Sequence, residues 1–153
     1  MSVHADTMKL PDMERRRRAV AATRKRFEGK PHRFGVNDCV KAGAAHVRNM
    51  GHRKALGLAK AGSYKNAIGA KRALQRAGFG SVADALTAAG FPEIAPAAAL
   101  PGDLLIASGT HGLDAVGVLI AHDTLFGYLE DDFAAGMQIL RFDPVTQSRA
   151  FRL

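Results

Sequence analysis

The stretch Gly35-Val36-Asn37-Asp38-Cys39 is the part of this sequence that says most about its fold. Gly35 interrupts regular structure and Asn37 is a good helix cap, so we predict a helix from Asn37 to about Met50. Cys39, the only cysteine of the chain, then falls in the first turn, where free N–H groups and the helix dipole stabilise a thiolate. A nucleophilic cysteine needs this placement, because the thiolate is its reactive form. The alternative is a structural role, since free cysteines are among the most buried residues.

Further helices are predicted on both sides of this stretch. The predicted helices cover residues 12–29, 37–50, 63–77 and about 81–90. Asp12 is expected to cap the first of them, and Ser81 followed by Asp84 resembles a capping box for the last. Residues 51–62 form either a short helix or a basic loop, and the proline-rich stretch 91–102 is predicted to be an extended connector.

The second half of the chain has the pattern of strands. Short apolar runs occupy residues 103–107, 115–121, 124–129 and 138–142, and residues 150–153 are expected to add an edge strand. Gly, Asp and His fill the turns between the runs, which is typical of an antiparallel meander. Because helices come first and strands follow, we predict an α+β fold. In it, N-terminal helices pack on a C-terminal antiparallel sheet of about four to five strands.

Length and composition indicate one globular domain. With 47% hydrophobic residues, the 153-residue chain can bury a core without a disulfide or a metal. We expect a flexible tail at residues 1–11 and a single domain at 12–153. A lone cysteine excludes an internal disulfide, and no histidine pair has metal-site spacing with a third ligand, so neither metal nor cofactor is expected. We see no signal peptide and no apolar run of the roughly 18 residues that a membrane span needs, so we expect synthesis in a cytoplasm.

The basic charge of the chain is concentrated in its first half. Residues 1–76 contain 19 of the 22 Lys and Arg residues and 5 acidic ones, whereas residues 77–153 contain 3 basic and 9 acidic residues. The first half is therefore expected to approach an anionic partner, such as nucleic acid, a teichoic or phospholipid anion, or an acidic protein. We interpret the run Arg15 to Arg18 as a solvated helix face or a contact with a partner protein. Nucleic acid is an unfavoured partner, because few aromatic residues accompany the basic ones.

Three motifs, taken in order, resemble those of the NlpC-type cysteine peptidases. They are Gly-x-Asn-Asp-Cys at 35–39, Pro-Gly-Asp-Leu-Leu at 101–105 and Ala-Val-Gly-Val at 115–118. The chain looks most like a small branch of that family encoded among the tail genes of bacteriophages and prophages. The resemblance covers about residues 15–153 and implies a permuted papain core, in which the cysteine begins a helix packed on an antiparallel sheet. It also implies that Cys39 matches the nucleophile, that 102–104 enter a strand, and that peptidoglycan stems are the usual substrate.

The resemblance fails at the catalytic base. In the family a histidine begins the strand that follows the Gly-Asp-Leu strand, whereas this sequence has Ala115 before Val-Gly-Val. Ala115 cannot take a proton, so Cys39 lacks the partner that would activate it. His111, four residues upstream, is the candidate replacement if its loop folds back towards the helix. His122 and Asp114 are poorer candidates, because in a regular strand both point to the side opposite Ala115.

Three functions follow from these observations. The favoured one is a structural component of a phage tail, near its tip, that keeps the NlpC-type fold without peptidase activity. It would contact other tail proteins, with the basic helix 12–29 as its docking arm, and would reside in the virion. The second is an active peptidoglycan-cleaving cysteine endopeptidase that uses Cys39 with His111 or another base. The third is a basic nucleic-acid-binding module.

Overall fold

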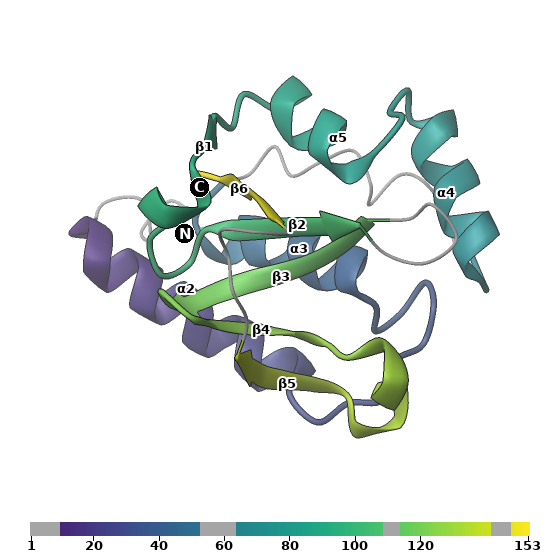
Figure 1. Cartoon of the computed structure of the whole chain (residues 1–153), viewed down its shortest axis with the longest axis horizontal. Coiled ribbons are helices and arrows are strands. Elements are labelled where there is room, and N and C mark those ends of the chain that lie inside the picture. Colours follow the sequence, from purple (N-terminus) through teal and green to yellow (C-terminus); the bar gives the residue numbers. More distant parts are fainter. Residues whose placement is uncertain (1–9, 53–63, 109–113, 142–147) are drawn as a thin grey trace, which may run out of the picture.

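The computed structural model describes residues 10–52, 64–108, 114–141 and 148–153. Within these residues it contains four α-helices, two short 3₁₀ helices and six strands (Figure 1). The helices are α2 (Asp12–Phe27), α3 (Cys39–Asn49), α4 (Ala67–Arg76) and α5 (Val82–Ala88), and the 3₁₀ helices are η2 (Pro96–Ala98) and η4 (Glu130–Ala135). The strands are β1 (Glu93–Ile94), β2 (Leu104–Ser108), β3 (Asp114–Ala121), β4 (Thr124–Tyr128), β5 (Met137–Arg141) and β6 (Ser148–Phe151). The predicted α+β class is confirmed. Most of the predicted tail and of the segment 51–62 lies outside the described residues.

The six described strands form one antiparallel sheet in the order β1-β6-β2-β3-β4-β5. Strands β2 to β5 form the meander that the sequence predicts. The expected edge position of the C-terminal strand is wrong, because Ala150 of β6 lies between Ile94 of β1 and Leu105 of β2. β1 has only two residues, too few to show an alternating pattern, and it brings the sheet above the expected number of strands.

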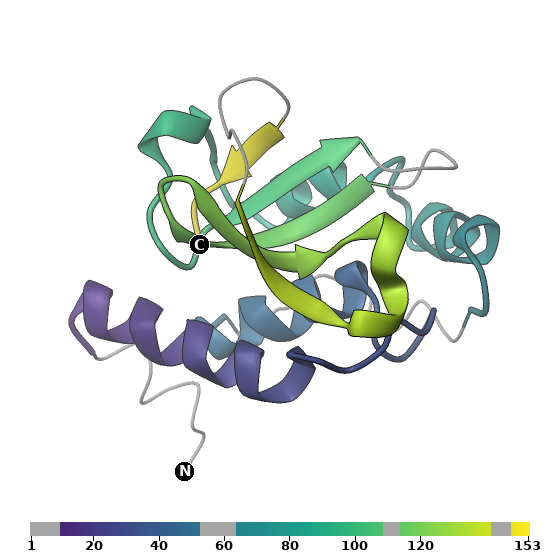
Figure 2. The same ribbon diagram turned by 60° about the horizontal axis from the view of Figure 1, so that its bottom comes forward.

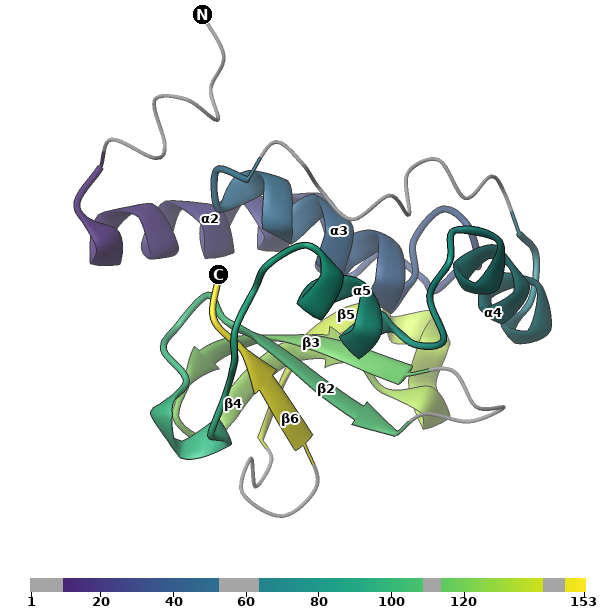
Figure 3. The same cartoon turned by 90° about the horizontal axis from the view of Figure 1, so that it is seen from above.

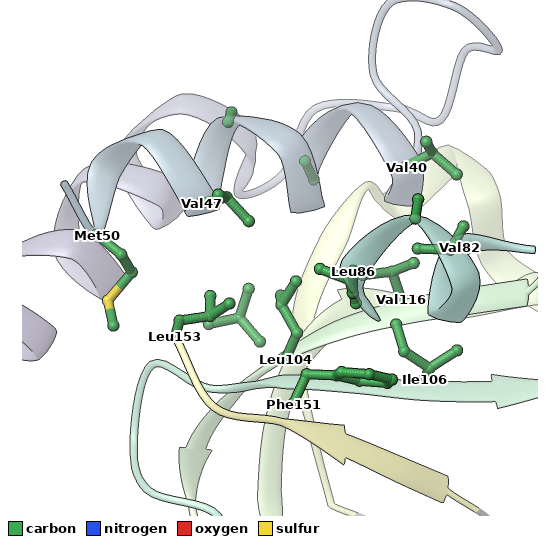
Figure 4. Close-up of a cluster of buried hydrophobic side chains, with 14 of the residues drawn as sticks. Val40, Val47, Met50, Val82, Leu86, Leu104, Ile106, Val116, Phe151 and Leu153 are labelled. Carbon is green, nitrogen blue, oxygen red and sulfur yellow. The ribbon is translucent and has the colours of Figure 1, made fainter. Parts of the chain in front are cut away.

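Helices α2, α3 and α5 cover one face of the sheet (Figures 2 and 3). Between the two layers, side chains of α3 and α5 meet those of the strands (Figure 4). This core includes Val40, Val47, Met50, Val82, Leu86, Leu104, Ile106, Val116 and Phe151. On the other face a smaller cluster is built around Leu105, Leu119 and Ala150. The main core therefore lies under the helices, and burial of its apolar surface is the principal stabilising contribution.

Helix α3 approaches the sheet closely because it presents small side chains to it. Residues 42–45 of the helix are all Ala or Gly, and all are buried. A Cβ atom built on Gly43 would lie only 3.0 Å from Cγ1 of Val116, so no spare room exists between α3 and β3. This close packing brings the first turn of α3, with Cys39, against the beginning of β3.

The residue that caps α3 is Asp38, one position after the expected Asn37. Its Oδ1 accepts a hydrogen bond from the Lys41 N–H at 2.8 Å, and its Oδ2 accepts one from the Gly35 N–H at 2.7 Å. The same carboxylate therefore holds both the helix start and the tight turn that precedes it.

Two other predicted caps have different outcomes. Ser81 caps α5 as expected, with its Oγ accepting a hydrogen bond from the Asp84 N–H at 3.0 Å. Asp12 lies inside the first turn of α2 and does not cap it, because the cap position belongs to Pro11. Its carboxylate is bonded to arginines of the same helix instead.

The run Arg15 to Arg18 is not the solvated block that the sequence suggests. Two of its members are exposed and pair with Glu14, but Arg15 and Arg16 are only 7% and 2% exposed. The helical period turns these two towards the core, on the same side as the buried residues later in α2. The Arg16 guanidinium lies 2.8 Å from the carboxylate of Asp103, which is fully buried.

Asp103 connects three separate parts of the chain. Its Oδ1 accepts hydrogen bonds from Arg16 of α2 and from the Leu153 N–H, at 2.8 and 3.0 Å. Its Oδ2 accepts one from the Leu100 N–H at 2.9 Å and lies 3.4 Å from Nε of Arg152. The aspartate of the Gly-Asp-Leu motif is thus an architectural residue, which joins α2, the entry to β2 and the segment after β6.

Candidate functional site around Cys39

Cys39 is the first residue of α3, and its side chain reaches the first residue of β3. The Sγ–H group donates to the carbonyl oxygen of Asp114 at 3.7 Å, and the cysteine is half-buried. The prediction that Cys39 lies in the first turn of a helix is therefore confirmed. Because Asp38 fixes where that helix begins, it also fixes the position of the sulfur.

The sulfur lies where two neighbouring strands separate. Strand β3 pairs with β4 only from Val118 onwards. Leu119 exchanges backbone hydrogen bonds with Gly102 and Asp103, which lie on the β2 side of β3. Along a strand, the N–H and C=O groups of successive residues point to alternate sides, so those of Asp114 and Val116 point towards the β4 side. No residue of β4 pairs with Asp114 or Val116 in the described sheet. The Cys39 thiol donates a hydrogen bond to the carbonyl oxygen of Asp114 instead.

This environment keeps the thiol protonated. Burial raises the pKa of Cys39 to about 12, and the neighbouring Asp38 carboxylate contributes in the same direction. Backbone N–H groups of Val116 and of the helix start lower the pKa, but they do not offset burial. The stabilisation of a thiolate that the sequence predicts at the helix terminus is therefore outweighed. At neutral pH the sulfur is a hydrogen-bond donor and a poor nucleophile.

The side chain that β3 turns towards the helices beside Cys39 belongs to Asp114. Val116 packs on α3, and alternation along the strand puts Asp114 on the same face and Ala115 on the opposite one. The Asp114 carboxylate accepts a hydrogen bond from the Val82 N–H, at the start of α5, at 3.2 Å. A histidine at position 115 would face away from the thiol. That Ala115 replaces a catalytic base stays a prediction, but its side chain is on the face of β3 away from Cys39, because a one-residue shift reverses every side chain of a strand.

The histidines considered as partners of Cys39 do not reach it in the described residues. His111 lies in the segment 109–113, outside those residues, so its predicted role stays a prediction. The side chain of His122 is 92% exposed in the turn after β3. That turn is about 23 Å from the start of the eight-residue strand, since each residue of a strand adds about 3.3 Å.

His46 belongs to the buried network at the other end of α3. Its Nδ1 lies 2.6 Å from Oγ1 of Thr23, and its Nε2 lies 2.8 Å from the carbonyl oxygen of Gly102. A carbonyl only accepts, so Nε2 carries the proton and Nδ1 accepts from the threonine hydroxyl. Burial lowers the pKa of His46 to about 4, which keeps the ring neutral. His46 is thus a packed structural residue.

An aromatic cluster that sequence reasoning missed lies close to the site. His32 stacks on Phe133 with ring centroids 3.9 Å apart, and it meets Phe34 and Tyr128 edge-on at 4.5 and 5.0 Å. The cluster fastens the loop before α3 to η4. Burial raises the pKa of Tyr128 to about 12, and the charges at the start of α3 contribute. No sequence signal links these residues, because they meet only when β4 folds back beside the loop.

Two further properties concern metals and membranes. Among the described residues, no three His, Cys, Asp or Glu side chains are grouped so that they could bind a metal ion. None of the described helices is both long enough and apolar enough to cross a membrane.

Comparison with known proteins assigns the chain to a family. No curated protein matches the sequence significantly. A family profile does match, and it extends over residues 8–153, which include every described helix and strand. The chain therefore belongs to the family described as "Domain of unknown function (DUF6950)".

Proposed function

We propose that this protein is a structural component of a bacteriophage tail, near its tip, built on an NlpC-type fold without a working catalytic pair. The observation that carries the proposal is the state of Cys39. Its thiol donates to a backbone carbonyl, and burial raises its pKa to about 12. A cysteine peptidase needs the opposite state, a thiolate prepared by a neighbouring base.

The surroundings of the sulfur support the same conclusion. The side chain on β3 nearest in position to a family base is Asp114, and its carboxylate is occupied by the Val82 N–H. A carboxylate beside a thiol also opposes thiolate formation, because two like charges would be brought together. The site thus retains the placement of a nucleophile, but its groups serve packing and backbone hydrogen bonding.

The tail setting rests on the resemblance of the three sequence motifs to phage-encoded NlpC-type proteins. A cysteine that begins a helix packed on an antiparallel sheet is consistent with that resemblance. The expected docking arm stays a prediction. Arg15 and Arg16 of α2 hold the helix to its own domain, so only the exposed residues of this helix are left for contacts with other tail proteins.

Two measurements test this function. The purified protein is expected to leave peptidoglycan intact, with the same soluble-product profile as Cys39→Ala. It is also expected in purified phage particles when these are examined by mass spectrometry. Cleavage of peptidoglycan that disappears in Cys39→Ala would overturn the noncatalytic function, and absence from the particles would overturn the structural one.

A working peptidase is the second candidate, and one observation favours it. The chain enters β3 at Asp114, whose carbonyl contacts the thiol, and His111 precedes that residue by only three positions. This short separation in the sequence is what keeps His111 as the candidate base. In this alternative His111→Ala abolishes peptidoglycan cleavage as completely as Cys39→Ala does, whereas His122→Ala does not.

A further inference from the structure

The longest stretch of uncompensated positive charge begins at Cys39 and not in α2. From residue 39 to residue 83 the sequence contains nine Lys or Arg residues and no Asp or Glu. Any carboxylate that neutralises these 45 residues must therefore come from another part of the chain or from another molecule. Helix α4 lies within this stretch, at one end of the molecule in all three views (Figures 1, 2 and 3).

Helices α2 and α4 are both basic, but they differ in how many of their cationic side chains form ion pairs. In α2, Arg17, Arg18 and Arg24 pair with Glu14 and Glu28, and the buried Arg15 and Arg16 pair with Asp12 and Asp103, whereas Lys25 and Arg26 form no ion pair with a described residue. In α4, Lys71, Arg72 and Arg76 form no ion pair with any described residue, and the same holds for Lys65 just before the helix. Most of the positive charge of α2 is thus paired within the domain, whereas no cation of α4 is paired with a described residue and all three are available to a partner.

The exposed face of α4 also carries an apolar side chain. The helix buries Ala70, Ala73 and Leu74 against the domain. Ile68 on the outside is 59% exposed, the highest fraction among the large hydrophobic residues described. Residues three, four or seven positions apart share a helix face, so Ile68, Arg72, Gln75 and Arg76 form one exposed stripe. We call this set the α4 stripe.

We propose that the α4 stripe docks an acidic segment of a partner protein that presents an apolar side chain among its carboxylates. Guanidinium groups match carboxylates in a two-bonded geometry, and Ile68 gives the partner's apolar side chain a place to bury. Nucleic acid fits less well, because a phosphate backbone offers Ile68 no apolar contact and the stripe has no aromatic side chain for base stacking. The inference extends the proposed structural role, since it names the surface and the kind of tail partner.

The test uses the full-length protein and a fluorescein-labelled peptide of repeated Glu-Glu-Leu-Glu units, with binding followed by fluorescence anisotropy. The Arg72→Gln, Arg76→Gln double variant is expected to weaken binding about fivefold. The matched control is Arg17→Gln with Arg18→Gln on α2, which removes the same charge and is expected to change binding less than twofold. Equal losses in the two double variants, or no binding by the wild type, would overturn the proposal.

A second comparison isolates the apolar contact and the class of partner. Replacing each Leu of the peptide by Ser is expected to weaken binding about fivefold to wild type and to have little effect on Ile68→Ser. If both peptides bind equally, or if a short DNA duplex of the same net charge binds more tightly through Arg72 and Arg76, the proposal is wrong. Circular dichroism of each variant checks that α4 is intact. Peptidoglycan cleavage by the wild type would refute the noncatalytic function and leave these binding results unaffected.

Discussion

The two ends of α3 hold the two most informative side chains of the molecule, and they are fixed in different ways. His46, near the C-terminal end, is fully buried and bonds through both ring nitrogens, at 2.6 and 2.8 Å. Cys39, at the N-terminal end, is half-buried and has one long contact, at 3.7 Å. Burial keeps both groups uncharged, with the pKa of His46 lowered and that of Cys39 raised. The difference indicates that the buried network around His46 stabilises the fold. Cys39 lies where a nucleophile would lie, but its side chain contributes little to stability.

The largest expected effect is at the His46 end, where Asp103 meets Arg16. Asp103→Asn removes the charge that compensates the buried guanidinium and turns one acceptor into a donor. We expect a loss of about 3 kcal/mol in the free energy of unfolding, because breaking the buried pair leaves the Arg16 guanidinium with only the more exposed Asp12 carboxylate as its partner. Urea denaturation measures it, with the exposed Asp132→Asn as control. A loss no greater than that of the control would contradict the architectural role of this motif.

The next effect is a dependence of stability on pH. The pKa of His46 is lowered from 6.5 to about 4, so the unfolded chain binds more protons than the folded one between these values. The stabilisation is complete above about pH 6.5 and is lost as the pH falls towards 4, by about 3 kcal/mol. His46→Gln should reduce this slope. Some slope remains in the variant, because burial also lowers the pKa of His32 and His52.

A smaller effect is expected at the Cys39 end. Cys39→Ala removes a weak hydrogen bond and part of a half-buried side chain, so the free energy of unfolding should fall by about 1 kcal/mol. Thermal unfolding of this variant beside His46→Ala compares the two ends directly. If Cys39→Ala were the more destabilising of the two, the contrast drawn between them would be wrong.

The smallest effect is expected on the outer face of α2. Arg17→Gln with Arg18→Gln removes two exposed pairs with Glu14, which solvent already screens. The urea midpoint should stay unchanged, whereas Arg16→Gln, one residue away, should lower it clearly. A similar shift of the urea midpoint in both variants would mean that burial does not decide how much an arginine of the run Arg15 to Arg18 stabilises the fold.

The order of elements and the start of α3 could be predicted because both depend on local pattern. Apolar periodicity and turn residues marked the helices and the meander from β2 to β5. The burial of Arg15 and Arg16 could not be predicted, because it depends on distant parts of the chain. Arg16 pairs with Asp103, 87 positions away, and Arg15 donates to the backbone carbonyls of Met50 and Leu153. The interior position of β6 depends likewise on its pairing with the distant strands β1 and β2.

The candidate site was predicted only in part. The capping residue types around 37–38 identified the helix start, and thereby Cys39. The sequence alone could not show which side chains of β3 face the thiol. Register is set by packing, and a shift of one residue exchanges Asp114 for Ala115. The raised pKa of Cys39 was missed for a similar reason, since desolvation depends on the completed fold.

The pKa of the Cys39 thiol tests the central claim most directly. It can be measured from the pH dependence of alkylation by iodoacetamide in the folded protein, with the urea-unfolded chain as reference. We predict that the folded thiol reacts slowly and shows no titration below about pH 10, whereas the unfolded thiol titrates near its usual value of about 8.5. A folded thiol that titrates below pH 8 would contradict the account and make Cys39 a prepared nucleophile.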